Sequence, residues 1–471
     1  MKRLALLSLL SVIGCGGQTG TLTLNIVTSP ADDPFADAVN VRVTVGDSVT
    51  VKTMPVNMGH FNFNFSQKPS TDAMPVLVEA LDMANNVVAY GKTPSISLTA
   101  VDQGPYAVWV GRPGRAAPAA AGLMPAKTEF AAVAINGLGI LYAGGRDKDG
   151  NTLQTTEVYD VFTHGIIETA PMNSVRAGAV GTAVAGIRAV VFGGATQMGL
   201  ATPGAPLNSV ELFDPTVGTG LWAPLAGDVT DARSAANVTA LPSGAALVSG
   251  GNDGNGSPLA SAALISTDTS PRLTAVSGPM VAARLGHATG PAKFPDGDGA
   301  ILFGGLPTGS TLPVAERLVG QSFTAYDMGD LGMQPNRLLA TATALADGRV
   351  LILGGKDASG PLASGFIITP NLPATVTPVP NALSVPREGH TATRVGNDIL
   401  VCGGGTTGGA LDDSCDLIDG TSVAIKETIK LGAGRRDHTA TVLEIGLVLI
   451  AGGTGPDGSP SGAIEIYTPK Q

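Results

Sequence analysis

The feature that most constrains this chain is a Gly-Gly pair that recurs at a nearly constant interval, each time directly after an apolar stretch. The first glycine of each pair stands at position 144, 193, 250, 304, 354, 403 or 452, so the successive intervals are 49, 57, 54, 50, 49 and 49 residues. The preceding stretches are short and rich in Leu, Val and Ile, as in LYAGG and LILGG. Units of this size cannot bury a core alone, so we predict an architecture in which seven repeats pack against their neighbours.

Each unit predicts four short strands. A strand and a tight turn precede the apolar strand that ends at Gly-Gly, and turns such as Asn136-Gly137 and Asp347-Gly348 supply the positive φ that a hairpin needs. A polar loop then leads to a third strand, at 157–160, 211–214, 262–265, 315–318, 365–368, 415–418 and 465–468. A weaker fourth segment, such as 168–172, precedes the next unit. The repeat is therefore a four-stranded antiparallel unit.

The period and the placement of Gly-Gly resemble those of the kelch-repeat β-propeller proteins. This resemblance implies an all-β fold in which seven blades pack around one axis. The last unit stops after its third strand, so we predict that residues 116–124, upstream of the first unit, supply its fourth strand. Residues 107–110 are the alternative donor. Either donor closes the ring and leaves no open sheet edge.

Composition agrees with this class and narrows the partners. The 64 glycines and 33 prolines are spread along the chain, as many turns between short strands require. Aromatic residues make up only 4% of the chain, so stacking surfaces for sugars or bases are few. A net charge of -10 would repel the phosphate backbone of a nucleic acid. We expect no nucleic-acid partner.

The N-terminus predicts export and lipid anchoring. Lys2 and Arg3 precede an apolar run from Leu4 to Ile13 that is too short for a permanent membrane span. Residues 12–15 resemble the lipobox of bacterial lipoproteins, in which the cysteine, here Cys15, is diacylated and becomes the new N-terminus after cleavage. The resemblance implies a signal peptide at 1–14, a lipidated tether at 15–18 and an outer-membrane or cell-surface location.

The segment between this tether and the repeats lacks their period. It predicts seven strands with period-two alternation, at 21–27, 39–45, 60–65, 74–81, 86–91, 95–100 and 106–110. We therefore expect a small β-sandwich (Ig-like/prealbumin-like) domain at 19–111. A Pro/Ala-rich linker at 112–122 follows, part of which closes the ring, and the seven-bladed propeller occupies 123–471.

A basic residue stands three residues ahead of the predicted innermost strand in every unit: Lys127, Arg176, Arg233, Arg284, Arg337, Arg387 and Arg435. The favoured interpretation is a structural clamp with acids of matching phase in the third strands, at Glu157, Glu211, Glu316, Asp416 and Glu465. The alternative is a ring of cations at the channel mouth that binds an anionic ligand. Ala263 and Ile367 interrupt the acids, so Arg233, Arg284 and Arg337 are the cations expected to keep a free face.

Three units add a histidine after the basic residue: His287, His390 and His438. Because they recur at one scaffold position with no local ligand spacing, we expect them to bond backbone carbonyls and predict no metal site. Galactose-oxidase-like enzymes share the propeller and hold copper with tyrosines and histidines. This chain has only six tyrosines and no domain after the last repeat, so we predict no cofactor.

Cys402 and Cys415 lie on adjacent strands of the sixth unit. A short hairpin brings such residues together, so export predicts a disulfide between them.

We expect a non-enzymatic, monomeric, lipid-anchored propeller whose loops bind a protein or a glycan at the cell envelope. One alternative is a lyase or sugar isomerase that binds an acidic substrate at the channel mouth through Arg233, Arg284, Arg337 and Arg387, with His287, His390 or His438 as the base. A purely structural envelope protein is the third hypothesis. Whether the chain is an enzyme stays open, because a fold does not specify a function.

Overall fold

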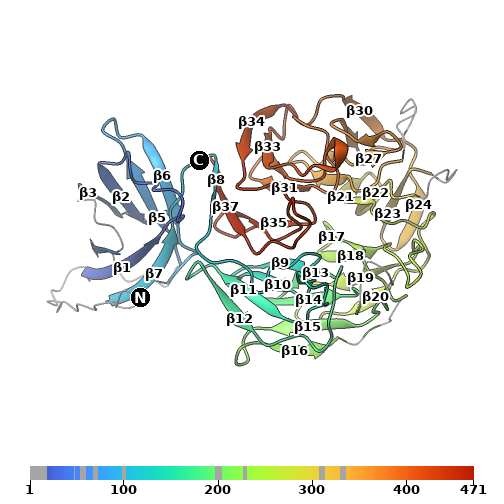
Figure 1. Ribbon diagram of the computed structural model, residues 1–471, viewed down its shortest axis with the longest axis horizontal. Helices are drawn as coiled ribbons and strands as arrows, with labels where there is room; N and C mark the ends of the chain where they lie inside the picture. Colours follow the sequence, from blue (N-terminus) through green and yellow to red (C-terminus); the bar gives the residue numbers. More distant parts are fainter. Residues whose placement is uncertain are drawn as a thin grey trace. The chain divides into compact units, whose positions relative to one another are not determined.

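The computed structural model describes residues 19–46, 48–53, 60–66, 73–97, 102–196, 204–225, 227, 231–306, 313–328 and 336–471 (Figure 1). These residues form β-strands and one short 3-10 helix, η1 (Thr407–Gly409), so the chain is all-β in its described part. Two compact units divide the chain. The small unit comprises Met1–Pro113, Val161–His164 and Lys470–Gln471, and the large unit comprises Gly114–Asp160 and Gly165–Pro469.

The small unit contains two sheets that share one core. The first has the order β4-β1-β7, with strands β4 (His60–Ser66), β1 (Thr19–Val27) and β7 (Asp102–Trp109). The second has the order β3-β2-β5-β6, with strands β3 (Ser48–Thr53), β2 (Asn40–Val45), β5 (Val76–Leu81) and β6 (Val87–Lys92). Strand β2 alternates buried and half-buried residues, and its valines join the core.

Sequence alternation finds six of the seven strands of this unit. The strand predicted at 95–100 is wrong in its described part, where only Ile96 forms an isolated bridge, with Met74. Strand β3 is the seventh described strand of this unit, and the sequence analysis did not predict it. Its exposed valines, Val49 and Val51, show why apolar alternation alone does not reveal which face of an edge strand is buried.

The described residues of the large unit form seven four-stranded antiparallel sheets, numbered in chain order, and one two-stranded hairpin. Sheets 1 to 3 contain β9 (Ala131–Ile135), β10 (Gly139–Ala143), β11 (Thr156–Asp160), β12 (Gly165–Thr169); β13 (Val180–Val184), β14 (Arg188–Phe192), β15 (Val210–Asp214), β16 (Leu221–Pro224); and β17 (Asn237–Ala240), β18 (Ala245–Ser249), β19 (Ala262–Ser266), β20 (Leu273–Ala275).

Sheets 4 to 6 follow the same plan. They contain β21 (Ala288–Phe294), β22 (Gly297–Phe303), β23 (Ala315–Val319), β24 (Ser322–Ala325); β25 (Thr341–Ala344), β26 (Val350–Leu353), β29 (Gly365–Thr369), β30 (Thr375–Val379); and β31 (Thr391–Val395), β32 (Asp398–Cys402), β33 (Ser414–Ile418), β34 (Ile425–Lys430). A two-stranded hairpin, β27 (Lys356–Asp357) with β28 (Gly360–Pro361), lies in the loop of sheet 5. Beyond their first one or two residues the second strands are buried, because apolar side chains cover both faces.

Sheet 7 takes its fourth strand from the other end of the repeat region. It contains β35 (Thr439–Val442), β36 (Val448–Ala451), β37 (Ile464–Thr468) and β8 (Arg115–Pro118). Ile466 is paired with Ala117, so the predicted upstream donor, 116–124, is confirmed for its first residues, 116–118, whereas 119–124 lie outside the strand. The alternative donor, 107–110, is wrong, because residues 107–109 belong to β7 of the small unit.

The first strands of the sheets contact one another in the order β9, β13, β17, β21, β25, β31, β35, and β35 in turn contacts β9. Figure 1 shows the labelled first strands toward the middle of the large unit and the fourth strands β12, β16, β20, β24, β30 and β34 at its periphery. Each sheet therefore meets its neighbours with its first strand inside.

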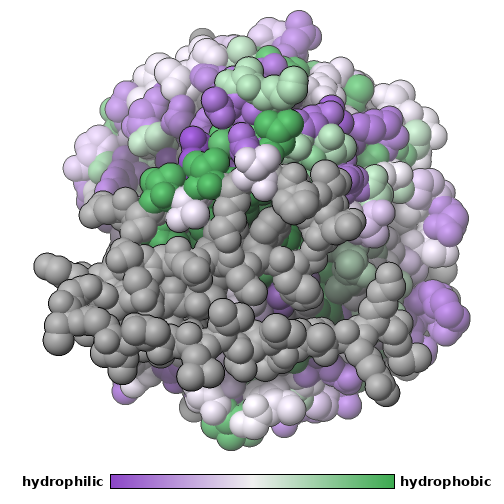
Figure 2. Space-filling model, turned by 90° about the vertical axis from the view of Figure 1, so that its left-hand side faces the viewer, coloured by the Kyte–Doolittle hydropathy of each residue, from purple (hydrophilic) through white to green (hydrophobic). Residues whose placement is uncertain are grey.

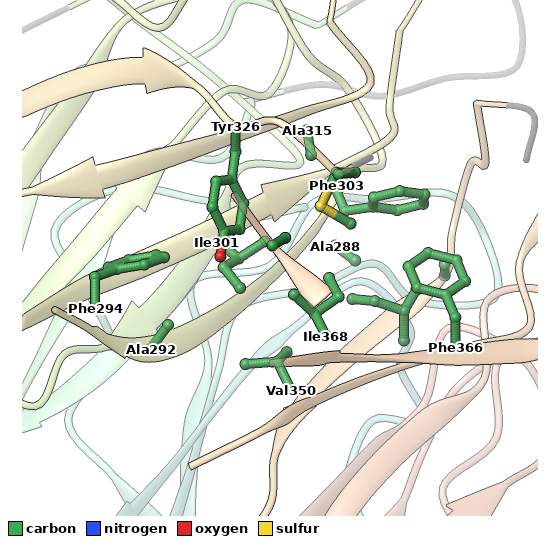
Figure 3. Packing of buried hydrophobic residues seen from close by; sticks show 14 residues of the cluster. Ala288, Ala292, Phe294, Ile301, Phe303, Ala315, Tyr326, Val350, Phe366 and Ile368 are labelled. Atoms are coloured by element: carbon green, nitrogen blue, oxygen red, sulfur yellow. The ribbon is translucent and has the colours of Figure 1, made fainter. Parts of the chain in front are cut away.

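Neighbouring sheets bury their faces against each other. Six hydrophobic clusters join sheets 1 and 2, 2 and 3, 3 and 4, 4 and 5, 5 and 6, and 6 and 7. Between sheets 4 and 5, the rings of Phe303 and Phe366 meet edge to face, with centroids 4.8 Å apart (Figure 3). Such contacts between sheets stabilise units that could not bury an apolar face alone.

Candidate functional site

The seven predicted cations lie inside the large unit, at the junctions between sheets. Every one of these side chains is buried, with at most 3% of its surface exposed. The free face predicted for Arg233, Arg284 and Arg337 is therefore wrong, because their exposed fractions are 0%, 0% and 1%. Arg387, with 0% exposed, likewise offers no surface to a ligand in this structure.

The five predicted acids lie opposite these cations and are also buried. The ion-pair distances are 2.6 Å for Lys127 with Glu157, Arg176 with Glu211 and Arg284 with Glu316, and Arg435 pairs with Glu465. Each pair joins the entrance of a sheet's first strand to that sheet's third strand. Because a buried charge is tolerated only when it is paired and hydrogen-bonded, the clamp is confirmed at these junctions.

Sheet 6 carries a second acid that sequence phase does not predict. Arg387 contacts both Asp412, at 2.6 Å, and Asp416, at 3.2 Å. Asp412 lies in the loop after the Gly-Gly pair, two residues before β33. Burial raises the pKa of Asp412 despite the neighbouring Arg387. The signal for this partner was the loop's acid-rich LDDS sequence, whose position in the unit differs from that of the strand acids.

In sheets 3 and 5, where the third strand lacks an acid, carbonyl oxygens serve the cation. Arg233 donates to the carbonyl oxygens of Gly250 and Ser261 at 3.0 and 2.8 Å. Arg337 makes the equivalent bonds to Gly354 and Ser364 at 3.1 and 2.7 Å. Burial lowers the pKa of each guanidinium to about 10, so both stay charged at neutral pH.

The Gly-Gly pairs tie each sheet to the next. The second glycine's N–H donates to the backbone carbonyl of the basic residue that opens the following sheet, at 2.7 to 3.2 Å in all seven cases. The donors and acceptors run Gly145 to Arg176, Gly194 to Arg233, Gly251 to Arg284, Gly305 to Arg337, Gly355 to Arg387, Gly404 to Arg435 and Gly453 to Lys127. The last of these bonds joins sheet 7 to sheet 1.

Close approach explains why the first residue of the pair is glycine. A Cβ atom at this position would lie within 3.0 Å of the same carbonyl oxygen of the next sheet in every repeat. The seven residues also have positive φ, between 53° and 70°, which L side chains rarely adopt. Both the contact and the conformation therefore require glycine.

A left-handed residue stands near each cation, and the sequence analysis did not predict it. The residue two positions after each basic residue has a φ between 50° and 67° in all seven units: Glu129, Gly178, Ala235, Gly286, Leu339, Gly389 and Asp437. Four of them are not glycine, although a left-handed conformation costs an L residue about 1–2 kcal/mol. Bonds such as Ala235 N–H to the Gly178 carbonyl, 2.9 Å, link adjacent members. The hydrogen bond between sheets offsets part of the strain.

The three histidines are buried between sheets. The Nε2 atoms of His287, His390 and His438 lie 2.9, 3.0 and 3.0 Å from hydroxyl oxygens of the preceding sheet, those of Ser249, Thr341 and Thr391. The expected backbone partner is present for His390, which has a hydrogen bond to the backbone of Arg387, whereas the hydroxyl partners of the three Nε2 atoms were not predicted. Desolvation, with a smaller contribution from the nearby arginine, lowers the pKa of each ring to about 3. These rings are neutral across the physiological range.

Glycines also make room for these rings. A Cβ atom on Gly403 would fall within 3.0 Å of the His438 ring, and one on Gly453 within 3.0 Å of the His438 Cβ. His287 and His390 meet the corresponding glycines in the same way. In sheet 1 the ring of Phe130 takes this place against Gly452 of sheet 7.

The remaining predicted residues are the cysteines. Cys402 and Cys415 are directly opposite each other on β32 and β33 and form the predicted disulfide. Cys15, the predicted lipidation site, lies outside the described residues.

The described residues contain no group of three or more His, Cys, Asp or Glu side chains placed to hold a metal ion. In the same part of the chain, no helix has the length and hydropathy that crossing a bilayer requires. Comparison with protein-family models finds no match for this chain. Comparison with curated proteins finds no match either.

Proposed function

We propose that this chain is a lipid-anchored, extracytoplasmic, seven-bladed kelch-type β-propeller that binds a protein or a glycan at the outer membrane or cell surface. The small unit would then be its membrane-side β-sandwich. One observation carries the propeller: the hydrogen bonds from the second glycine of each pair form a cycle of seven, and the bond from Gly453 to Lys127 completes it. A linear stack of sheets would have no such last bond.

Further contacts between sheets 7 and 1 support a closed ring. Strand β8 completes sheet 7, the Gly137 N–H donates to the Glu444 carboxylate at 3.1 Å, and the hydroxyl oxygens of Thr128 and Thr454 are 3.2 Å apart. These contacts lie at both ends of the first strands. They join residues more than 300 positions apart in the chain.

A cross-link tests closure directly. In a Thr128→Cys, Thr454→Cys variant the two sulfur atoms would replace hydroxyls already in contact, so we expect a disulfide to form on mild oxidation. Closing so long a loop should raise the free energy of unfolding by about 5–6 kcal/mol in the chain-entropy account. Mobility on a non-reducing gel and denaturant unfolding are the measurements. Closure is wrong if this pair reacts no faster than the control pair Thr128→Cys, Ser234→Cys, which joins sheets 1 and 3.

Binding is assigned to the loops because the repeated charges already serve the scaffold. The loops after Gly-Gly differ in sequence from sheet to sheet and carry exposed residues such as Lys148, Asp149 and Asn255. Loops on a rigid scaffold are common recognition elements. Figure 2 shows the side of the molecule at the left of Figure 1, where the described residues mix hydrophobic and hydrophilic side chains. Catalysis by His287, His390 or His438 is not proposed, because all three are buried and uncharged.

Recognition is tested with the full chain as bait in envelope extract, followed by affinity measurement with the captured protein or glycan. Replacing Lys148, Asp149 and Asn255 by alanine should weaken the affinity at least tenfold. Replacing Asn136 and Ser243, exposed turn residues at the other ends of their strands, should leave it unchanged. Equal affinity in both variants would show that the loops after Gly-Gly are not the binding surface.

A further inference from the structure

The point at which the chain enters the small unit is close to Cys15. Strand β1 begins at Thr19, four residues after that cysteine. A chain extends at most about 3.6 Å per residue, so Thr19 lies within about 14 Å of a lipid carried by Cys15. Residues 15–18 are outside the described part of the chain.

The entry point lies at one end of the sheet β4-β1-β7. Thr19 is paired with Ser66, the last residue of β4, and Thr21 is paired with Asp102, the first residue of β7. Strands β1, β4 and β7 therefore each have one terminus at this end of the sheet.

The chain leaves the small unit at the opposite end of this sheet. Strands β1 and β7 are parallel, and Val27, the last residue of β1, is paired with Trp109, the last residue of β7. Strand β1 has nine residues, which span about 27 Å at the rise of an extended strand. If β1 and β7 were antiparallel, the chain would enter and leave the small unit at the same end of the sheet. Because they are parallel, the two points lie at opposite ends.

Ion pairs hold the exit in place. Arg112, three residues after Trp109, contacts Asp32 at 3.2 Å and Asp37 at 2.9 Å. Both acids belong to the loop that follows β1, and the N–H of Val110 donates to the Val27 carbonyl at 2.9 Å. The exit is thereby bonded to the far end of the entry strand.

From these contacts we infer that the small unit stands on the lipid bilayer as a rigid spacer. The sheet end at Thr19, Ser66 and Asp102 faces the lipid headgroups, and the exit near Trp109 is held about 27 Å farther out. This inference rests on the proposed lipid anchor. It adds a membrane-facing surface and a fixed distance, which a flexible tether would not provide.

Energy transfer from tryptophan to dansyl lipid measures this distance. The chain has two tryptophans, so Trp222→Phe leaves Trp109 as the only donor, at the exit. A second chain, Trp109→Phe, Trp222→Phe, Gln18→Trp, places the only donor at the entry. Both are lipidated full chains in vesicles of phosphatidylethanolamine and phosphatidylglycerol that contain dansyl phosphatidylethanolamine. We expect strong transfer from residue 18 and at least fivefold weaker transfer from Trp109.

A linker supplies the matched control. Twenty Gly/Ser residues inserted after Gly17 have a root-mean-square span of about 25 Å, so the unit can tumble and the two donors should then transfer about equally. The spacer is wrong if Trp109 transfers as strongly as residue 18 with the native tether, or if the contrast survives the linker. The mass of the N-terminal peptide tests lipidation separately. If cells leave Cys15 unmodified, the anchor proposal fails, and a maleimide lipid coupled to Cys15 still tests the spacer.

Discussion

Lowering the pH from 7.5 to 5 is expected to destabilise the large unit by about 6 kcal/mol through His287, His390 and His438, because each histidine costs about 1.4 kcal/mol for every pH unit below its unfolded pKa of about 6.5. Their folded pKa values, lowered to about 3, lie below the ordinary value of 6.5. The unfolded chain therefore binds more protons between pH 6.5 and 3. The stability that depends on the three neutral histidines is fully present above about pH 6.5 and is lost progressively as the pH falls through this window.

The repeats themselves provide the matched variants. Sheets 2, 3 and 5 have alanine where the histidine stands: Ala179, Ala236 and Ala340. Each His→Ala replacement should reduce the difference in unfolding free energy between pH 7.5 and 5 by about 2 kcal/mol. The replacement also leaves a cavity at both pH values, which this difference cancels.

Urea unfolding followed by Trp222 fluorescence, in a Trp109→Phe background, reports on the large unit alone. Asp412, whose pKa burial raises, acts in the opposite direction and is common to all variants. An acid response that is unchanged in the triple His→Ala variant would show that other groups cause it.

Removing the guanidinium of Arg284 is expected to cost about 3–5 kcal/mol, because it leaves the Glu316 carboxylate buried without its cation. Both side chains are 0% exposed and lie 2.6 Å apart. Glu316→Ala should cost less, about 1–3 kcal/mol. Arg284 then keeps the carbonyl oxygens of Pro313 and Val314, a situation like that of Arg233 in sheet 3.

A double-mutant cycle with denaturant unfolding isolates the Arg284–Glu316 coupling. The exposed pair Arg349–Asp347, at 2.7 Å, is the control, and Arg349→Ala should cost less than about 1 kcal/mol. If Arg284→Ala folds with unchanged stability, the clamp is not structural, and the alternative of an anion-binding cation regains support.

Residue pattern alone predicted the all-β class, the seven repeats and the borrowed strand. Alternation and Gly-Gly are local signals, and a missing fourth strand in sheet 7 implies a donor elsewhere. The donor's bounds, Arg115–Pro118, required the structure, because 107–110 has an equally suitable apolar pattern. Packing against β1 in the small unit made 107–109 part of β7 instead.

The candidate site was predicted only in part. The matching phase of Arg284 and Glu316 was visible in the sequence, since a basic residue recurs in every unit and an acid recurs at the position of Glu316 in five of the seven. Their burial was not visible in the sequence. A charged residue that recurs from unit to unit gives the same sequence pattern whether it lines a channel or lies between two sheets. Asp412 escaped prediction for a related reason: it reaches Arg387 from a loop, where the repeat spacing gives no constraint.

By itself the sequence determined which residues recur and therefore which unit is repeated, because strand alternation, turn residues and glycine requirements act over a few neighbouring positions. Only the tertiary structure decided what those residues touch. The way in which separate sheets meet determines the bond from Gly453 to Lys127 and the hydroxyl partners of the three histidines. It also determines that all seven predicted cations are buried. Such contacts join positions tens to hundreds of residues apart, and their distances follow from packing in space.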